Sequence, residues 1–308
     1  MNVFLAGATG TIGRSLVSML VEEGHKVVAM TRAPEKIPDL EAIGAEPVLG
    51  DVFDVARLNE VVERAAPEII IHQLTSFGAT ARDPLVETNR LRIEGTGNLV
   101  AAARVAGARR FIAQSISFLC TPKGAGLADE NTPLYLDAPE AFRPLIEAVA
   151  ELERQTLSVP GIDGIVLRYG HFYGPGTFYA PDGSTAASVR NGQMPIVGNG
   201  MGTYSFIHVD DAAVATIHAL TRGAPGIYTI VDDAPVPISE WLPVYTELLA
   251  APTPDHMAET VALETIGPFL VFMMTEQRGA SNTKAKRELG WQLALESWRD
   301  GFKALLTN

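Results

Sequence analysis

Little in this 308-residue chain suggests an oxidising compartment, a nucleic-acid partner or a metal. Cys120 is its single cysteine, so neither an intramolecular disulfide nor a cysteine-based metal site can form, and a reducing cytoplasm is expected. The 24 Lys and Arg are outnumbered by 36 Asp and Glu, and the formal net charge of −12 argues against a surface for phosphate backbones. These scarcities favour a small molecule as the partner, with no nucleic acid and no metal.

Long apolar runs are also missing. The most apolar late stretch, Ile266 to Met274, is far shorter than the roughly 20 residues that a membrane helix needs. No positively charged, cleavable leader precedes the first apolar run. With 47% hydrophobic and 19% charged residues, the composition is ordinary for a soluble α/β enzyme. We therefore expect no membrane partner, and we expect residues 266–274 to form a buried or pocket-lining helix.

A glycine-rich segment near the N-terminus is the most informative motif. The run Gly7-Ala8-Thr9-Gly10-Thr11-Ile12-Gly13 follows the apolar stretch Asn2–Ala6 and opens into a segment with helical spacing. Glycines there allow a tight turn and close approach of the backbone to a pyrophosphate, which faces the N–H groups and dipole of the helix N-terminus. A plain glycine turn is the alternative. The expected cofactor contacts in this turn are Gly7, Thr9, Gly10, Thr11, Ile12 and Gly13.

Apolar runs suited to buried strands alternate with amphipathic helical segments, which predicts βαβ units and a parallel sheet covered on both faces. These runs are Lys26–Met30, Glu46–Leu49, Glu68–Gln73, Arg109–Gln114 and Asp163–Tyr169. We predict an α/β, doubly wound Rossmann domain over residues 1–170, completed by about 203–232, where Thr203–Val209 and Ile227–Val231 are predicted strands. Residues 171–202 and 233–308, with loop and helix signals, are predicted to form a smaller substrate-binding lobe.

The Gly-x-x-Gly-x-x-Gly spacing resembles that of the extended short-chain dehydrogenase/reductases, including the NAD-dependent epimerases and dehydratases. Further segments match this family in the right order: Gly50-Asp51-Val52, His72-Gln73-Leu74-Thr75, Leu167-Arg168 through Tyr173-Gly174-Pro175-Gly176, Phe206 through Asp210-Asp211-Ala212, and Lys284 through Leu289-Gly290-Trp291. The resemblance implies that Asp51 and Val52 meet the adenine, and that Leu74 and Thr75 lie at the nicotinamide half. It also implies a possible homodimer, because helices at about 84–107 and 143–158 pair in similar proteins.

The choice of cofactor depends on the end of the second strand. NAD-specific members place an acidic residue there to accept from the ribose hydroxyls. This chain has Thr31 and Arg32 instead, and Arg32 with Lys36 could clamp a 2′-phosphate. The alternative is that both are solvated loop charges. We expect NADP, with NAD as the alternative.

The usual catalytic pair is absent. Reductases of this family use a Tyr whose phenol is made acidic by a Lys four residues later, with a Ser or Thr in the proton network. None of the seven tyrosines is followed by a Lys at that spacing. Family members also carry a Glu four residues beyond the Lys. If Glu151 is that residue, Arg143 and Glu147 occupy the two catalytic positions.

Other residues are therefore candidates for catalysis. Ser115 and Ser117 lie where the family's Ser or Thr is found, and Ser115 is the first catalytic candidate as well as a cofactor contact; strand-end capping is its alternative role. Tyr135, His171 and Tyr173 are candidate replacement acids, although each could be a hydrogen-bonded core residue.

Substrate binding is predicted to be largely apolar. Nucleotide-sugar epimerases usually carry Arg-Asp before Phe-Ile-His-Val-Asp-Asp, whereas this chain has Tyr204-Ser205, which disfavours a diphosphate. Aromatic residues in the lobe favour an apolar or aromatic ligand. The candidate substrate contacts are Ser117, Phe172, Tyr179 and Tyr204, with Arg278 for an anion.

The sequence thus predicts an NAD(P)-dependent oxidoreductase that acts on a small, largely apolar carbonyl, imine or alkene. Two alternatives stay open. One is an epimerase, isomerase or dehydratase in which hydride leaves and returns. The other is a dinucleotide-binding sensor without catalysis.

Overall fold

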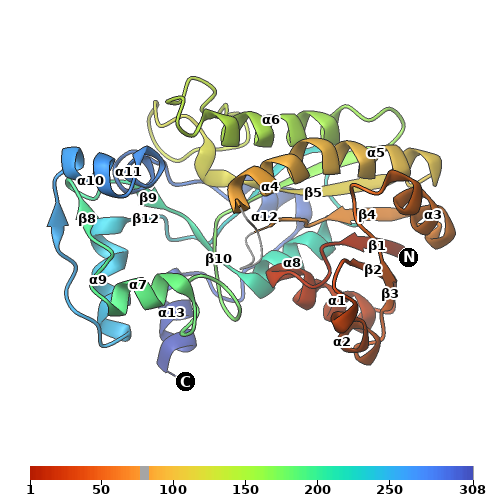
Figure 1. Ribbon diagram of the computed structural model, residues 1–308, viewed down its shortest axis with the longest axis horizontal. Coiled ribbons are helices and arrows are strands. Elements are labelled where there is room, and N and C mark those ends of the chain that lie inside the picture. Colours follow the sequence, from red (N-terminus) through yellow and green to blue (C-terminus); the bar gives the residue numbers. More distant parts are fainter. Residues whose placement is uncertain (77–82, 308) are drawn as a thin grey trace.

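A parallel sheet forms the centre of the computed structural model, which describes residues 1–76 and 83–307 (Figure 1). Its seven strands follow the order β11-β6-β5-β4-β1-β2-β3, and every pairing is parallel. The strands are β1 (Asn2–Ala6), β2 (Lys26–Thr31), β3 (Glu46–Leu49), β4 (Ile69–His72), β5 (Arg110–Ile116), β6 (Asp163–Tyr169) and β11 (Gly226–Ile230). Strand order reverses between β1 and β4, which is where α/β sheets of this kind bind ligands.

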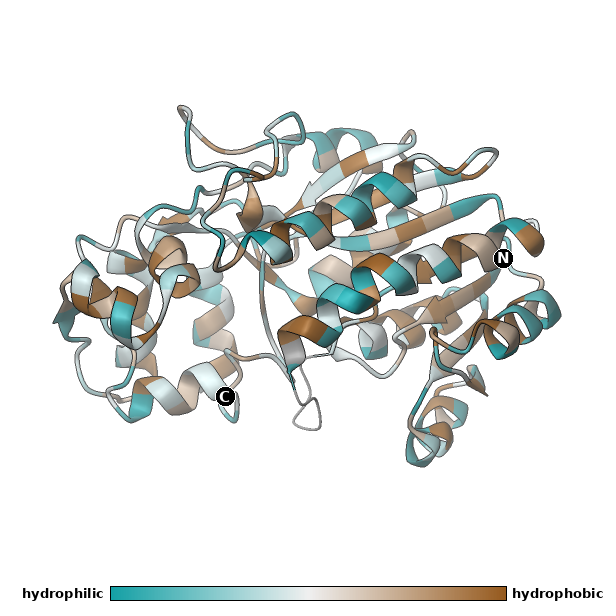
Figure 2. Cartoon of the chain, turned by 45° about the horizontal axis from the view of Figure 1, so that its top comes forward, coloured by the Kyte–Doolittle hydropathy of each residue, from teal (hydrophilic) through white to brown (hydrophobic). Residues whose placement is uncertain are grey.

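Helices cover both faces of the sheet (Figure 1). On one face lie α1 (Thr11–Glu22), α2 (Ile37–Ala42), α8 (Val209–His218) and α12 (Thr283–Leu289). On the other lie α3 (Val55–Ala65), α4 (Pro84–Arg90), the π-helix η2 (Leu91–Gly95), α5 (Thr96–Val105) and α6 (Arg143–Leu157). Figure 2 shows hydrophobic and hydrophilic residues alternating along these helices, as expected when one face of each is buried against the sheet.

A smaller lobe packs beside the carboxyl ends of the strands around an aromatic core that includes Tyr204, Phe206, Trp241 and Phe302. Its strands pair as β7 (His171–Tyr173) with β10 (Phe206–His208), β8 (Ile196–Val197) with β13 (His256–Met257), and β9 (Thr203–Tyr204) with β12 (Val236–Pro237). Its helices are α7 (Ser184–Arg190), α9 (Ile238–Leu248), α10 (Glu259–Thr265), α11 (Pro268–Thr275) and α13 (Trp298–Thr307). Two 3₁₀ turns, η1 (Pro34–Lys36) and η3 (Ser117–Leu119), lie between strands and helices of the sheet domain.

The predicted doubly wound α/β fold is confirmed, with small shifts at the strand ends. The prediction of a single strand over 203–209 is wrong, because the extended segment is interrupted at Ser205 and forms two short strands. There the backbone carbonyl accepts from the N–H of His171 at 2.8 Å and the hydroxyl accepts from the N–H of Ala280 at 2.8 Å. These bonds separate β9 from β10 and keep both out of the main sheet. The apolar stretch at 266–274 forms most of α11, and among the described residues no helix has the length and apolarity to span a bilayer.

Candidate active site

The glycine turn after β1 is packed tightly at two positions and open at the third. Gly7 has φ +97°, and a Cβ there would lie 2.7 Å from the carbonyl of Gln73. A Cβ on Gly13 would lie 2.2 Å from the carbonyl oxygen of Gly7. Gly10 has an ordinary φ of −73°, and its nearest neighbour would be 3.3 Å away. Gly7 and Gly13 therefore shape the turn, while Gly10 leaves space above it.

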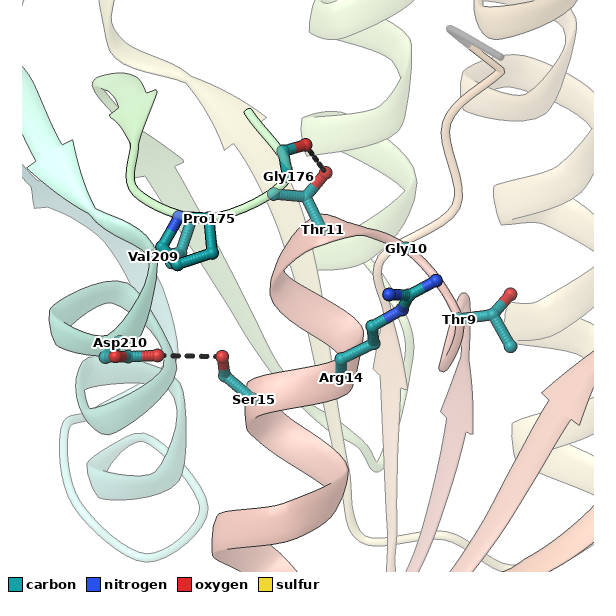
Figure 3. Close-up of a pocket in the computed structure, with 9 residues that line it drawn as sticks. All are labelled: Thr9, Gly10, Thr11, Arg14, Ser15, Pro175, Gly176, Val209 and Asp210. Atoms are coloured by element: carbon teal, nitrogen blue, oxygen red, sulfur yellow. Dashed lines mark hydrogen bonds between the residues drawn. The ribbon is translucent and has the colours of Figure 1, made fainter. Parts of the chain in front are cut away.

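That space is a cavity of about 290 Å³ at the N-terminus of α1 (Figure 3). Three segments distant in sequence line it: Thr9, Gly10, Thr11, Arg14, Ser15, Pro175, Gly176, Val209 and Asp210. The Thr11 hydroxyl donates to the carbonyl of Gly176 at 3.3 Å, and Ser15 donates to Asp210 at 2.8 Å. The first turn of α1 carries no acidic residue and no side-chain cap, so its N–H groups and helix dipole favour a diphosphate here.

Arg14 is a pocket residue that the sequence analysis missed. It is exposed, and Figure 3 shows its guanidinium extending beside the glycine turn. Within the described chain it makes no ion pair or hydrogen bond through its side chain. Its place directly after the third glycine, in a helix turn without acids, was the signal that could have found it. Arg14 adds a full positive charge to the partial charge of the helix end.

The residues predicted at the adenosine end lie together because β2 and β3 are paired in register. Arg32 Nη1 is 3.9 Å from Asp51 Oδ2, and both side chains are exposed. The carbonyl of buried Val52 accepts from Asn98 Nδ2 at 2.9 Å, which fixes the loop after β3. Lys36 Nζ instead lies 3.5 Å from Asp39 Oδ2, in the first turn of α2. Arg32 is therefore the better placed of the two predicted clamp residues.

The loop after β4 continues this edge of the sheet. Leu74 donates its N–H to His72 Nδ1 at 3.2 Å and accepts from Gln114 Nε2 at 3.1 Å, so it is held between β4 and β5. Thr75 is exposed. Gly7 packs directly on Gln73 and Leu74, which makes the glycine turn and this loop neighbours along one edge.

Ser115 and Ser117 have different surroundings. The buried Ser115 hydroxyl donates to Glu153 at 2.7 Å, and Glu153 also forms a two-point ion pair with Arg168, with both N···O distances 2.7 Å. Ser117 Oγ is buried and lacks a partner among the described residues. The hydroxyl proton of Ser115 is thus committed to a carboxylate, whereas that of Ser117 remains free for a ligand.

The geometry of α6 favours a different register for the missing catalytic pair. Glu151 is half-exposed and pairs with Arg154, while Glu153 is buried. If Glu153 is the family's Glu, the same spacing of four puts Val149 at the Lys position and Leu145 at the Tyr position. Both are buried in an apolar cluster with Phe142 and Phe272. By contrast, Arg143 is only half-buried and Glu147 is exposed to solvent. The positions facing the core are therefore aliphatic.

Several predicted site residues do not line the cavity, and Tyr173, Tyr179 and Tyr204 belong to the aromatic core of the smaller lobe. Tyr173 is fully buried against Gly301, where no Cβ would fit, and burial raises the pKa of its phenol. Tyr179 and Tyr204 are also buried, and desolvation raises the pKa of each. Phe172 packs on Tyr169, with 5.1 Å between ring centroids. This burial gives Tyr173 no exposed phenol with which to protonate a ligand.

His171 and Tyr135 contact aromatic and polar side chains outside the core of the smaller lobe. The His171 ring stacks on Phe118 at 4.0 Å, and its Nε2 is 3.4 Å from Gln277 Oε1. Burial lowers the pKa of His171 to about 3, so the imidazole is neutral at physiological pH. Tyr135 is half-buried, and its ring centroid is 5.5 Å from that of Phe272. Both belong to the apolar cluster against which Phe118 also packs. Gln277 Nε2 is buried without a partner in the described structure.

Arg278 is already occupied by backbone groups. Its guanidinium donates to the carbonyls of Lys123, Ala125 and Gly126 at 2.8, 3.1 and 3.1 Å. It ties the loop at 123–126 to the segment after α11, which leaves little capacity for an anionic ligand.

Comparison with known proteins adds a family and named relatives. A model of the NAD dependent epimerase/dehydratase family matches residues 3–230. The chain is 44% identical over 305 residues to 3-diazoavenalumate denitrifying reductase of Streptomyces sp., covering 98% of this chain and 99% of the relative.

Two further relatives are more distant reductases. The chain is 28% identical to 4-hydroxy-2-methyl-3-oxo-4-farnesyl-3,4-dihydroquinoline-1-oxide ketoreductase of Stigmatella aurantiaca, covering 94% of this chain and 92% of the relative. It is 26% identical to 2-alkyl-3-oxoalkanoate reductase of Stenotrophomonas maltophilia (strain K279a), covering 86% and 80%. Among solved structures, UDP-glucose 4-epimerase of Thermotoga maritima superposes with a TM-score of 0.79 at 20% identity, covering 100% of this chain and 98% of the epimerase.

The open position of Gly10 leads to the first prediction. Gly10→Val should weaken dinucleotide binding by at least about 100-fold in calorimetry, because the branched side chain fills the cavity, while its backbone angles allow normal folding. Gly10→Ala should cause a smaller loss. Gly13→Val should fail to fold, because its side chain meets a backbone carbonyl. Unchanged cofactor affinity in a folded Gly10→Val protein would remove the phosphate role of the turn.

The different surroundings of Ser115 and Ser117 lead to the second prediction. Ser115→Ala should lower the free energy of unfolding by about 1–3 kcal/mol, because Glu153 loses a donor in a buried ion pair. Ser117→Ala should leave stability nearly unchanged and should lower turnover. Denaturant unfolding and steady-state kinetics on both variants check this. A stable Ser115→Ala protein with turnover reduced tenfold would instead make Ser115 the catalytic group.

Proposed function

This chain belongs to the NAD-dependent epimerase/dehydratase family and is an oxidoreductase, and we propose that it is an NADPH-dependent reductase whose acceptor takes hydride without help from a protein acid. The acceptor class is a small aromatic or apolar molecule carrying a strongly electrophilic group. An aromatic diazo compound fits best.

The residues along the sheet edge fit a nicotinamide dinucleotide. The N-terminus of α1, the space above Gly10 and the charge of Arg14 suit the diphosphate. Arg32 suits the 2′-phosphate, with Asp51 beside it at the adenosine end, and Leu74 and Thr75 suit the nicotinamide half. When bound, the reduced cofactor supplies hydride. The chain itself supplies binding, orientation and electrostatics.

The observation that carries the proposal is the aliphatic character of the buried face of α6. In the register counted back from Glu153, Leu145 and Val149 would take the places from which a Tyr and a Lys act, and both pack among aromatic rings. His171 is neutral and Tyr173 is buried with a raised pKa, so neither is suited to donate a proton near pH 7. Ketone reduction needs that proton.

An acceptor that already carries a leaving group can take hydride without a proton from the protein. When hydride adds to the ring carbon of an aromatic diazonium ion, the C–N bond breaks, dinitrogen leaves with the bonding pair, and no proton enters the product. The name of the 44% identical relative, a diazo compound's denitrifying reductase, supports this class. A protonated imine also needs no further proton, because hydride adds to its carbon and the π pair of the C=N bond becomes the nitrogen lone pair, whereas a carbonyl or alkene requires a proton from water.

The residues around His171 would hold the acceptor. The half-buried rings of Phe118 and Tyr135 suit an aromatic ligand, whereas the His171 ring is already covered by Phe118 and by Tyr204, with ring centroids 4.0 and 4.4 Å away. Ser117 Oγ and Gln277 Nε2 are unpaired donors that can orient its polar groups. These residues position the acceptor and exclude water, and hydride transfer needs both.

A homodimer in a reducing cytoplasm completes the proposal. Val86, Ile93 and Val105 on the α4–α5 helix and Leu157 on α6 are exposed apolar residues on the helices that the family resemblance implicates in pairing. The single cysteine, Cys120, is buried and free, which agrees with a reducing environment.

Cofactor preference should depend on Arg32. Arg32→Ala should weaken NADPH binding by tens of fold and leave NADH nearly unchanged, because one charge-assisted phosphate pair is worth about 2 kcal/mol. Lys36→Ala is the matched control and should change NADPH affinity far less, since Lys36 is turned toward Asp39. Equal affinity of the parent protein for NADPH and NADH would contradict this.

The reaction is tested with [4,4-²H₂]NADPH and an aromatic diazonium salt. We expect one deuterium on the ring carbon that carried nitrogen, one equivalent of dinitrogen per NADPH consumed, and a rate nearly independent of pH from 6 to 8, after subtraction of the reaction without protein. Acetophenone is the comparison acceptor and should react much more slowly. Product formed without net NADPH oxidation would favour the isomerase alternative, and tight NADPH binding with no turnover on either acceptor would favour the sensor.

A further inference from the structure

Arg92 is a buried cation without a counter-charge. Its side chain is 5% exposed, and its one hydrogen bond goes to Asn89 Oδ1 at 3.2 Å. No carboxylate among the described residues lies within ion-pair distance of it. Burial lowers the pKa of its guanidinium only to about 10, so the group stays charged at neutral pH. Most buried charges are paired, so this one calls for an explanation.

Its neighbours on the same helix face locate Arg92. Thr88, Arg92 and Thr96 are spaced four apart and all are buried. Thr88 Oγ1 accepts from the N–H of Ser76 at 3.0 Å, and Thr96 Oγ1 lies 3.1 Å from His72 Nε2. Arg92, between the two threonines, is therefore level with the loop that joins His72 to Ser76. Leu74 and Thr75, the residues proposed at the nicotinamide half, lie in that loop.

The third boundary of this region is α6. Both α4 and η2 pack against it. Arg92 also lies in the π-helical turn η2, and such turns are frequent at functional sites. The fold thus brings a buried cation to the side of α6 that faces η2.

A buried guanidinium without an acid destabilises the empty protein, so we expect such a group to be retained where a ligand compensates for its charge. The phosphates of the proposed cofactor already have Arg14, Arg32 and the end of α1. Arg278, the other candidate for an anion, is held by three carbonyls.

We propose that Arg92 receives a carboxylate of the substrate, so that the acceptor is an aromatic or aliphatic acid. This inference rests on the proposed function for the existence of a substrate beside the nicotinamide half. The names of two reductase relatives, acting on a diazoavenalumate and an oxoalkanoate, denote acids and support the choice of a carboxylate. Arg92 would bind the acid through two parallel N–H···O bonds, a geometry that Lys cannot reproduce.

Binding of inert acids tests this without any turnover. Calorimetry on the NADP⁺-loaded parent protein uses cinnamate, 4-hydroxybenzoate and octanoate, each against its amide. We expect at least one acid to bind tenfold or more tightly than its amide. Arg92→Met should abolish that preference, Arg92→Lys should retain part of it, and Arg104→Met, an exposed site on the same helix, should retain all of it.

Two further measurements separate a binding role from a structural one. Arg92→Met should raise the unfolding temperature of the ligand-free protein, because an unpaired buried charge is replaced by an apolar side chain, and it should leave NADPH affinity unchanged within twofold. A lower unfolding temperature, a parallel loss of NADPH affinity, or no preference for any acid over its amide in the parent would each overturn the proposal. If the acids bind as expected but no acceptor is reduced, the proposed function fails and the carboxylate site stands.

Discussion

The buried ion pair between Glu153 and Arg168 holds the active-site side of the molecule together. Its carboxylate joins α6 to β6 and, through Ser115, to β5, while Arg168 also reaches the carbonyl of Thr132 in the loop after β5. Removing either partner would leave an uncompensated charge in the core, which costs several kcal/mol. The pair therefore fixes the rotation of α6 about its axis, and that rotation decides which of its side chains are buried and would face the proposed acceptor.

The fold could be predicted from the sequence because its strands are continuous apolar runs and its phosphate turn has fixed glycine spacing. The bounds of the edge strand β3 and of the buried strand β6 match their predictions. The segment 203–209 has the same apolar character, but Ser205 bonds to His171 and Ala280, residues far away in the sequence, and these bonds break the strand. Such long-range bonds leave no periodic signal.

The candidate site was less predictable, for an electrostatic reason. The sequence identifies charged and aromatic residues but not their partners. Lys36 and Arg278 have the sequence character of free cations, yet Asp39 and three carbonyls hold them. Among the described residues, Arg14 has no side-chain partner and Arg92 has only the amide oxygen of Asn89 and no carboxylate. Similarly, Glu151 and Glu153 are two residues apart, and only burial shows which one belongs to the core. Whether a charge is paired depends on tertiary contacts, so it becomes visible only in the structure.

The distribution of charge also bears on the chemistry. A reductase with a tuned phenol can neutralise the oxyanion that forms when a carbonyl takes hydride. In the proposed site, Leu145 and Val149 are aliphatic and His171 is neutral, and the cations Arg14 and Arg92 would lie at the ends of the proposed ligands. Such a site stabilises poorly any negative charge that develops at the reacting atom, but it does not hinder an acceptor that begins positively charged and becomes neutral. The loss of the Tyr and Lys pair is therefore consistent with a change of acceptor and does not require a loss of activity.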